Sequence, residues 1–520
     1  MKFTFKAEIK TERKPNTGTQ ERLMNQFGDY EKFDALGLAK LVKDREVSAH
    51  ELLAEAKARL AKFNPMINAV ISPMDSLAES LIEKLDTSSP FAGVPFLVKD
   101  LMLPFAGFPM SNGSIAMKDY LPPEDGEMAK RLNASGLITF GKTSTSELGA
   151  SALTNTAAFG ETKNPWDLTR NSGGSSGGSS AAVAARIVPM AYSSDGGGSI
   201  RLPASYCGIF GFKPSRGLNK FEDLTRAWAG AVVTHVSTLS VRDSAAYLDL
   251  VNGHTDHGYS IANPAQHTYL NAVTRPPKRL RIALITRAPT GTGVQAECIN
   301  AARLAAKHCE ALGHQVEESD WNFDGVELMR AFITIVFRYT SRDVGNVAKL
   351  LNIEQQNLAI ELNTRFMAMV GSGIRDEQVQ QALTVWKQVS DRLSDFYQRY
   401  DVILTPTVAT PPLRSDAFDP NALEKLLMHG LIATGFAKKM FSNAFIDVII
   451  HKALYQTPFT PIANATGQPA MSVPLYWGND GLPHGAQFMA TEGNDRLLFQ
   501  LAAQLELEHP WKHKVPPLCR

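Results

Sequence analysis

The amino-acid sequence predicts an α/β fold built around a buried sheet. Short apolar runs bounded by turn residues alternate with segments of helical periodicity, which is typical of strands enclosed by helices. No linker rich in charge, proline or serine divides the 520 residues, and 44% of them are hydrophobic, which is ample for one large core. We therefore expect a single large domain with a helical insertion over residues 31–520, after a polar arm of residues 1–30.

The expected elements follow this alternation along the chain. Apolar positions between Asp34 and Leu60 recur at helical spacing, and Ser48 with Glu51 three residues later has the pattern of a capping box. Helices are also expected at 127–135 and 180–186, and the chain from about 324 to 451 is mainly helical. Buried strands are expected at residues 94–98, 136–140, 188–192, 280–285, 402–404 and 470–475.

Charge and cysteine content exclude several kinds of protein. With 53 basic and 52 acidic residues, the formal net charge is +1, so neither a nucleic-acid nor a membrane partner is expected. The four cysteines form no CxxC pair, which indicates unpaired thiols in a reducing compartment. Residues 1–6 lead into polar sequence, and no run of about 18 apolar residues occurs anywhere, so we expect a cytoplasmic protein.

Two glycine-rich segments, residues 171–180 and 194–201, are the most unusual features of the chain. The first could be a flexible Gly/Ser linker. It leads, however, straight into a small-residue helical stretch at 181–185, and the strand that follows ends in the second segment. Glycines at such positions let the backbone come close to a ligand. We therefore interpret both segments as parts of one functional site.

Residues 136–143 match the phosphate-loop pattern G-x4-G-K-[ST] letter for letter. That loop needs a strand before its first glycine and a helix that begins at its lysine. Here a helix precedes Gly136, which we interpret as the helix C-cap, and the strand-like residues lie between the glycines. We therefore expect no ATP or GTP binding.

Residues 173–177 fit the G-x-S-x-G pattern of an α/β-hydrolase nucleophile elbow. The serine of that elbow directly follows a buried strand, whereas residues 164–170 have the composition of a loop. No downstream histidine has neighbours that single it out as a base. The sequence therefore favours another arrangement of its serines.

The order of several motifs resembles the amidase signature family. Its Gly-Gly-Ser-Ser-Gly-Gly block stands at residues 173–178, Asp-x-Gly-Gly-Ser-Ile-Arg at 195–201 and Cys-Gly-x-x-Gly-x-Lys-Pro at 207–214. The family's Val-Pro-x-x-x-Lys-Asp strand stands at 94–100. The resemblance extends from about residue 34 to 511, with further likenesses at 141–147, 404–407, 467–470 and 481–483. It implies the amidase signature fold, with a central mixed β-sheet covered by helices.

The resemblance implies a catalytic triad that cleaves amide bonds through an acyl-serine intermediate. The family's residues correspond to Lys99 as base, Ser175 as proton shuttle and Ser199 as nucleophile. A serine hydroxyl needs a group that accepts its proton, and burial at the end of an apolar run would lower the pKa of Lys99. From the residues alone, a solvated surface lysine would be the ordinary interpretation of Lys99.

Family members similar to this chain also have an oxyanion hole made of backbone N–H groups, and loss of one such donor costs on the order of 3 kcal/mol. The expected donors are Gly196, Gly197 and Gly198. The family places a cis peptide bond before its bridging serine, here between Gly174 and Ser175. Positions that support the loop in the family correspond to Ser176, Asp195 and Arg201.

Two residues depart from the family pattern. The family usually has a bulkier residue in place of Gly196, so we expect a more mobile oxyanion loop or a wider acyl pocket. Bacterial members similar to cyclic aminohexanoate-dimer hydrolases tolerate small residues there, so the departure does not indicate inactivation. His484 stands where the family favours an aliphatic residue.

No cofactor and no metal are expected. His254 with His257, and His509 with His513, lack a matched third ligand. Some aromatic residues could line a substrate cleft, although core packing is the ordinary role of each: Trp228, Phe332, Phe337 and Tyr339.

We therefore expect an amidohydrolase that acts on a small-molecule amide, with a homodimer as one oligomeric state it could take. An amidotransferase subunit would use the same triad to release ammonia from glutamine for a tRNA-bound substrate. A catalytically silent binding protein on this scaffold is a further alternative, against which the complete triad argues. We expect a signature core at about residues 90–250, whereas residues 324–451 match the family least and are expected to shape the substrate pocket.

Overall fold

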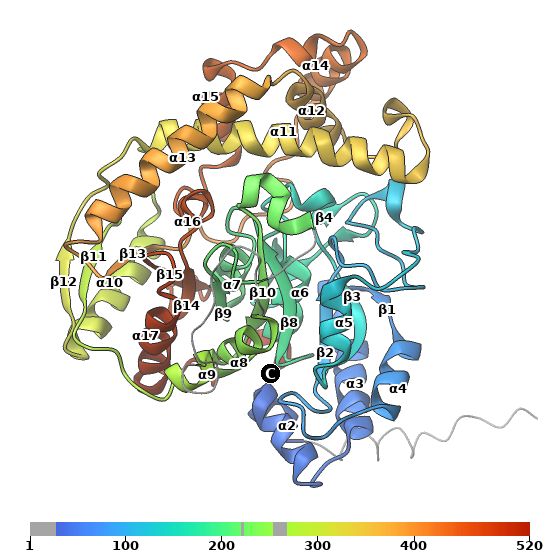
Figure 1. Ribbon diagram of the computed structural model, residues 1–520, viewed down its shortest axis with the longest axis vertical. Helices are drawn as coiled ribbons and strands as arrows, with labels where there is room; N and C mark the ends of the chain where they lie inside the picture. The colour runs from blue at the N-terminus through green and yellow to red at the C-terminus, as the bar shows by residue number, and fades with distance from the viewer. Residues whose placement is uncertain (1–27, 220–222, 253–267) are drawn as a thin grey trace, which may run out of the picture.

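The computed structural model confirms the predicted α/β fold and describes residues 28–219, 223–252 and 268–520. Within these residues, one mixed sheet of eleven strands is flanked by helices (Figure 1). Across the sheet the strands are ordered β1 (Val70–Pro73), β3 (Ile138–Thr143), β2 (Pro95–Lys99), β8 (Met190–Asp195), β10 (Val233–Thr238), β9 (Phe210–Lys213), β14 (Ala470–Trp477), β15 (Pro483–Ala490), β13 (Val402–Pro406), β11 (Arg281–Leu284) and β12 (Gln315–Glu318).

Parallel pairing brings the ends of two strands to one edge of this sheet. β2 lies between β3 and β8 and runs parallel to both, with Leu97 opposite Ala191. Functional groups gather beyond the carboxyl ends of parallel strands. Lys99 at the end of β2 and Asp195 at the end of β8 are therefore at the same edge, where Val233 of the antiparallel β10 pairs with Asp195.

Most helices pack around the sheet. They are α2 (Ala35–Lys43), α3 (Ala49–Ile67), α4 (Asp75–Glu83), α5 (Glu127–Asn133), α6 (Gly177–Ala184), α7 (Arg201–Cys207), α8 (Val241–Val251), α9 (Tyr269–Ala272), α10 (Ala296–Ala311), α16 (Thr460–Thr466) and α17 (Asp495–Glu508). Two small hairpins complete this part of the chain, β4 (Asn155–Thr156) with β5 (Gly160–Glu161) and β6 (Lys163–Asn164) with β7 (Asp167–Asn171).

The first glycine-rich segment forms the start of α6, all of whose residues are buried. The helix contains only small side chains and valine, so its backbone can lie close to its neighbours. An ideal Cβ atom at Gly178 would stand 2.5 Å from the amide nitrogen of Ser144, closer than such atoms approach. This segment is therefore a packed part of the fold, and the linker interpretation is excluded.

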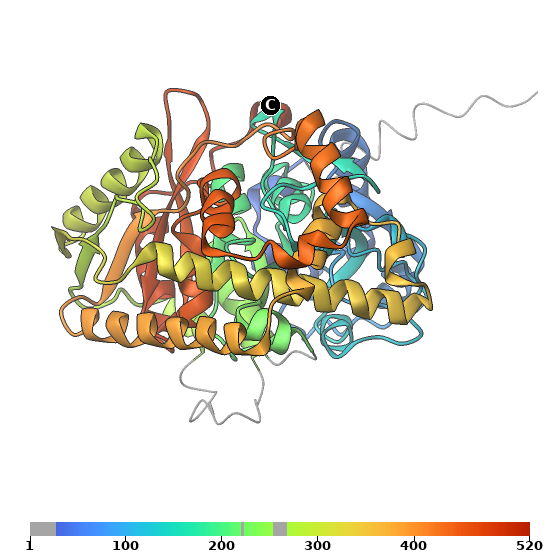
Figure 2. The same cartoon turned by 90° about the horizontal axis from the view of Figure 1, so that it is seen from above.

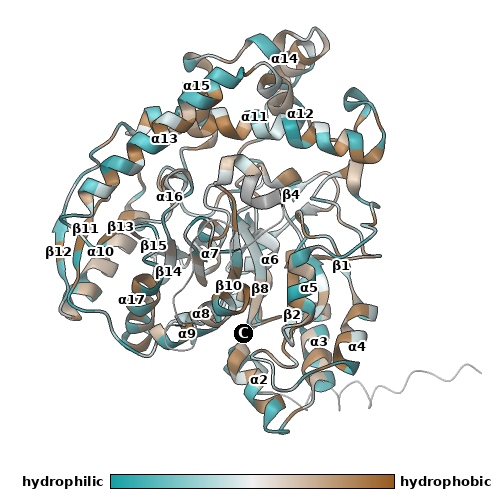
Figure 3. Ribbon diagram, in the orientation of Figure 1, coloured by the Kyte–Doolittle hydropathy of each residue, from teal (hydrophilic) through white to brown (hydrophobic). Residues whose placement is uncertain are grey.

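Five helices form what we call the helical roof: α11 (Gly325–Leu351), α12 (Leu362–Ser372), α13 (Asp376–Phe396), α14 (Ala422–Ala433) and α15 (Asn443–Ala453). α11 and α13 run side by side across one end of the molecule (Figures 1 and 2). α13 carries hydrophilic and hydrophobic residues along its whole length (Figure 3). Its buried residues recur at helical spacing and form one stripe: Ala382, Trp386, Val389, Leu393 and Phe396.

The predicted strands and helices lie within a few residues of their expected bounds, and Ser48 and Glu51 form both bonds of the capping box at the start of α3. Two local expectations are wrong. Residues 164–170 are not a plain loop, because most of them form the β6–β7 hairpin. The C-cap of α5 is Ala134, and Gly136 lies two residues further on with φ +85°.

The phosphate-loop match does not form a phosphate loop. Lys142 lies in β3 instead of at a helix start, and its ammonium contacts Asp100 and the carbonyl of Pro109. Of the expected polar arm, residues 1–27 lie outside the described part of the chain. No helix in the described part is long and apolar enough to cross a membrane.

Candidate active site

Three serine hydroxyls surround the amine of Lys99. Its Nζ atom lies 2.7 Å from Ser175 Oγ, 2.9 Å from Ser176 Oγ and 2.9 Å from Ser194 Oγ. Lys99 comes from the end of β2 and Ser194 from β8, while Ser175 and Ser176 come from the turn before α6. The sequence indicated all of these groups except Ser194, whose only signal is its place before Asp195 at the end of a buried strand.

Burial is the main influence on the charge of Lys99. The side chain is fully buried, and this lowers the pKa of its amine to about 7, although the negative charge of Asp195 acts in the opposite direction. A neutral amine has two hydrogens to donate and one lone pair. Ser176 Oγ already donates its hydrogen to the carbonyl of Ser194 at 3.0 Å, so it can only accept from Lys99. The lone pair of Lys99 can then face Ser175.

The peptide bond between Gly174 and Ser175 is cis, as the resemblance implies. Gly173, just before it, has φ +84°, a left-handed conformation that favours glycine. An ideal Cβ atom at Gly174 would stand 2.9 Å from the backbone of Leu153, so no larger residue fits there. The turn therefore presents Ser175 to Lys99 through a backbone that only glycines allow.

Ser199 is close to this group but more accessible. Its side chain is half-buried, whereas Ser175 is buried. The backbone N–H of Ser176 donates to the carbonyl of Ser199 at 3.3 Å, which ties the two glycine-rich segments together. Among the described residues, no hydrogen bond engages the Ser199 hydroxyl. Hydroxyl pairs of this kind often close only when substrate binds.

A buried ion pair fixes the second glycine-rich segment. Arg201 Nε and Nη2 donate to the two carboxylate oxygens of Asp195 at 3.0 Å each, and both side chains are fully buried. Burial alone would raise the pKa of Asp195, but Arg201 and Asn464 hold it far below its usual range. Arg201 also donates to Asn464 at 2.6 Å and to Gln487 at 2.7 Å. Sequence reasoning missed Asn464 and Gln487.

The amides expected to form the oxyanion hole are not equivalent. The N–H of Gly198 donates to Asp195 Oδ1 at 2.7 Å, so the structure assigns it to fixing the loop. Thr460 Oγ1 donates to the carbonyl of Gly197 at 2.7 Å, which orients the neighbouring peptide plane. In the described structure, no acceptor engages the N–H groups of Gly197 and Ser199.

An aromatic residue fills the space that Gly196 leaves. An ideal Cβ atom there would stand 3.1 Å from the Trp228 ring and from Val232, so a bulkier residue would displace one of them. Trp228, at φ +50°, meets Phe332 of α11 edge to face with ring centroids 6.3 Å apart. The expectation of a widened pocket is therefore wrong, because Trp228 occupies that volume. Phe332 also stands against Gly197.

The other singled-out side chains have structural partners. His484 in β15 contacts Asp480 at 3.1 Å through Nε2 and the Cys298 thiol at 3.9 Å through Nδ1. Phe337 packs edge to face on Phe445, and Arg342 lies over the ring of Tyr339.

No group of three or more His, Cys, Asp or Glu in the described chain is placed to hold a metal ion. The His509 ring lies 3.5 Å from that of His308, whereas His254 and His257 lie outside the described residues. All four cysteines are unpaired.

Comparisons with known proteins agree with this geometry. The family model described as Amidase matches residues 51–499. The 6-aminohexanoate-cyclic-dimer hydrolase of Paenarthrobacter ureafaciens is 34% identical over 493 residues, which cover 93% of this chain and 96% of that protein. The lipoamidase of Enterococcus faecalis is 31% identical over 484 residues, which cover 92% of this chain and 64% of that protein.

Solved structures also show a similarity to this class of hydrolase. A 6-aminohexanoate cyclic dimer hydrolase complexed with substrate superposes with a TM-score of 0.85 at 32% identity, covering 95% of this chain and all of that one. The family model and this structural match each cover most of the described chain. The chain belongs to the amidase family.

Proposed function

We propose that this chain, an amidase that hydrolyses carbon–nitrogen amide bonds, uses Ser199 as nucleophile, Ser175 as proton shuttle and Lys99 as base. The observation that carries the proposal is the contact of a buried lysine, whose pKa is lowered to about 7, with three serine hydroxyls. At neutral pH a large fraction of such an amine is uncharged and can accept a proton. Ser199 is more accessible than Ser175, and its carbonyl accepts a hydrogen bond from the backbone N–H of Ser176.

In the proposed acylation, Ser199 Oγ forms a bond to the amide carbon and its proton moves to Ser175. The proton of Ser175 moves to Lys99. The negative oxygen of the tetrahedral intermediate is then held by the N–H groups of Gly196, Gly197 and Ser199. The Gly198 amide already serves Asp195.

The carbon–nitrogen bond then breaks, and the proton on Lys99 returns through Ser175 to the leaving nitrogen. This gives a free amine and an ester on Ser199. Water repeats the sequence on the ester, which releases a carboxylic acid and restores Ser199. In this scheme Ser176, Asp195 and Arg201 position the reacting groups without touching the substrate.

A small-molecule amide is the substrate class, and we infer that both linear and cyclic amides of aliphatic amino acids are accepted. The name of the 34% identical relative specifies a cyclic dimer of 6-aminohexanoate for that protein. We infer that a signature core of about residues 90–250 carries out the chemistry, while residues 324–451 select the substrate. Phe332 of α11 packs directly on the glycine-rich loop, which supports this division.

The experiment is amine release from a panel of aliphatic, aromatic and cyclic amides, with glutamine included. Ser199→Ala and Lys99→Met are each expected to lower kcat by on the order of 10⁴-fold. Lys213→Met is the matched control. Lys213 is also fully buried with a pKa lowered to about 7 by burial, but its amine contacts the carbonyl of Pro214.

If Lys213→Met reduces kcat as strongly as Lys99→Met, burial of a lysine and not its contact with the serines would explain the loss. Activity that survives Ser199→Ala would remove Ser199 from the mechanism. Ammonia release from glutamine alone would instead favour an amidotransferase subunit.

A further inference from the structure

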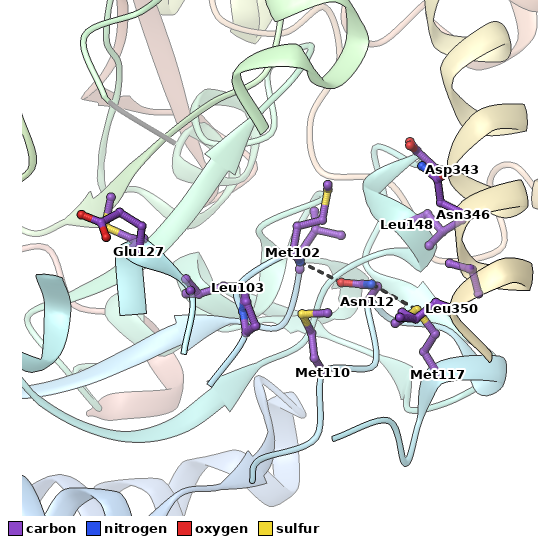
Figure 4. Close-up of a pocket in the computed structure, with 15 residues that line it drawn as sticks. Met102, Leu103, Met110, Asn112, Met117, Glu127, Leu148, Asp343, Asn346 and Leu350 are labelled. Carbon is purple, nitrogen blue, oxygen red and sulfur yellow. Dashed lines mark hydrogen bonds between the residues drawn. The ribbon is translucent and has the colours of Figure 1, made fainter. Parts of the chain in front are cut away.

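A cavity of about 480 Å³ lies between the loop after β2 and the far half of α11 (Figure 4). Leucine, methionine and valine side chains make most of its wall. The few polar residues in the wall are Asn112, Glu127, Asp343 and Asn346.

The cavity adjoins the serine–lysine group. Leu101 and Leu148 are part of its wall, and Leu101 follows Lys99 by two residues. Gly149 lies between wall and active site: an ideal Cβ atom there would stand 2.8 Å from Leu101 and 3.6 Å from Ser175 Oγ. The cavity therefore lies next to the active site, with Gly149 between its wall and the Ser175 hydroxyl.

The wall is held in a defined shape by Asn112. Its side-chain oxygen accepts from the N–H of Met102 at 2.7 Å, and its carbonyl accepts from the N–H of Leu148 at 2.8 Å. Its side-chain nitrogen lies 3.2 Å from the sulfur of Met117. Met102, Asn112 and Leu148 all have φ near +50°, an uncommon conformation for residues other than glycine. A left-handed backbone conformation at these residues is kept only where the surrounding structure holds it in place.

Asp343 is the acidic group that this wall leaves available. In the described chain, neither a hydrogen bond nor an ion pair engages its carboxylate. The neighbouring Arg342 lies over the ring of Tyr339, 4.5 Å from its centroid. Glu127, the other acid of the wall, pairs with Arg131 at 3.1 Å. Burial raises the pKa of Asp343 to about 6, although the positive charge of Arg342 acts in the opposite direction. The carboxylate is therefore mostly ionised at neutral pH, and a cationic partner would stabilise this ionised form.

We propose that this cavity binds the distal end of the substrate's acyl chain, an aliphatic segment that ends in a primary ammonium group paired with Asp343. The inference rests on the proposed function. It adds a recognition residue and a chemical class of ligand, an ω-ammonium alkyl chain. The apolar wall covers the methylene groups, and the carboxylate offsets the desolvation of the ammonium.

Helix geometry gives the length of this chain. Phe332, which stands against Gly197, and Asp343 are eleven residues apart on α11, which is about 16 Å along the axis. An extended chain advances about 1.2 Å per atom, so a chain that spans this rise has roughly 13 bonds. Two 6-aminohexanoate units joined head to tail have about this length.

The test compares two acyl p-nitroanilides of equal length. The 12-aminododecanoyl compound ends in an ammonium group, and the tridecanoyl compound ends in a methyl group. Wild type is expected to prefer the ammonium compound. Asp343→Asn is expected to lower kcat/KM for that compound by about 10-fold or more and to change tridecanoyl hydrolysis by less than about twofold. Glu127→Gln, the matched control in the same wall, is expected to spare both.

Equal losses on both compounds in Asp343→Asn would overturn the proposal, as would a wild type that does not distinguish them. A selective loss in Glu127→Gln alone would also overturn it, because the ammonium would then pair with the other acid. Asp343→Lys is a second test, and this variant is expected to prefer the tridecanoyl compound with its methyl end. Loss of tridecanoyl hydrolysis in Ser199→Ala would support the proposed function independently of the results with the Asp343 variants.

Discussion

The signature core and the helical roof differ in how far their Arg–Asp ion pairs are exposed to solvent. In the core, Asp195 and Arg201 are fully buried, and each is held by several hydrogen bonds. In the roof, Arg330 of α11 pairs with Asp447 of α15, and about a third of each side chain is exposed, 34% and 35%. The roof also leaves apolar side chains in solvent, with Leu426 of α14 69% exposed.

We relate this difference to the two tasks that we infer for these regions, chemistry in the core and substrate selection in the roof. A buried charge loses much when its partner is removed, because it can neither reach water nor move away. An exposed pair contributes little, because solvent replaces the lost partner. We therefore expect the chemistry to depend on a few core residues, and the roof to tolerate change while it selects substrates.

The largest expected contrast is between Asp195→Asn and Asp447→Asn, two removals of one carboxylate charge from an Arg pair. Asp195→Asn leaves Arg201 buried without its counter-charge and is expected to cost about 3–5 kcal/mol of unfolding free energy. Asp447→Asn is expected to cost at most about 1 kcal/mol. Urea unfolding of both variants measures the contrast, and similar losses would contradict the division between core and roof.

The next contrast is in pH dependence. Burial lowers the pKa of Lys99 to about 7, and the mechanism needs its neutral form, which is populated above that pH. For a neutral substrate, kcat/KM is expected to rise about tenfold per pH unit below pH 7 and to level off above it. Lys452→Met in the roof removes an exposed lysine paired with Glu424 and is expected to leave the profile unchanged. A flat wild-type profile between pH 5 and 8 would argue against Lys99 as base.

A smaller effect is expected where core and roof touch. Phe332→Leu removes the aromatic contact of α11 with Trp228 in the core and its contact with Trp386 of α13 in the roof, each with ring centroids 6.3 Å apart. The expected cost is about 1 kcal/mol, together with a change of KM larger than the change of kcat. Thermal unfolding and steady-state kinetics on one amide measure both. A kcat loss as large as that of Lys99→Met would place Phe332 in the chemistry itself.

The smallest effect is expected at the roof surface. Leu426→Ser exchanges a side chain that is already in solvent, so the free energy of unfolding is expected to change by less than about 0.5 kcal/mol. A chemical denaturation curve is sufficient to check this. A marked destabilisation would show that α14 is covered in solution.

Local signals predicted much of the core. The capping box of α3, the buried strands and the two glycine-rich segments each follow from residues that are neighbours in the sequence. The family resemblance then supplied the pairing of Lys99 with Ser175 and the cis bond before it, both of which the structure contains.

Contacts between distant segments could not be predicted in this way. Asn464 and Gln487 reach Arg201 from more than 260 residues along the chain, with no motif that marks them. Trp228 fills the space beside Gly196 through a left-handed conformation that tryptophan rarely adopts. Asp343 lies in a helix whose periodicity shows which face is buried but not what the face encloses. Tertiary packing determines each of these.

The cavity has a consequence for ring-shaped substrates. When a cyclic amide opens, the departing amine stays attached to the same molecule that is esterified to Ser199, at an effective concentration on the order of millimolar. Left free, it competes with water and can close the ring again. An ammonium held by Asp343 is protonated, and Asp343 lies about 16 Å along α11 from Phe332, the residue that stands against Gly197. A carboxylate at the far end of the cavity would thus keep the released amine from attacking the ester, so that the ring does not close again.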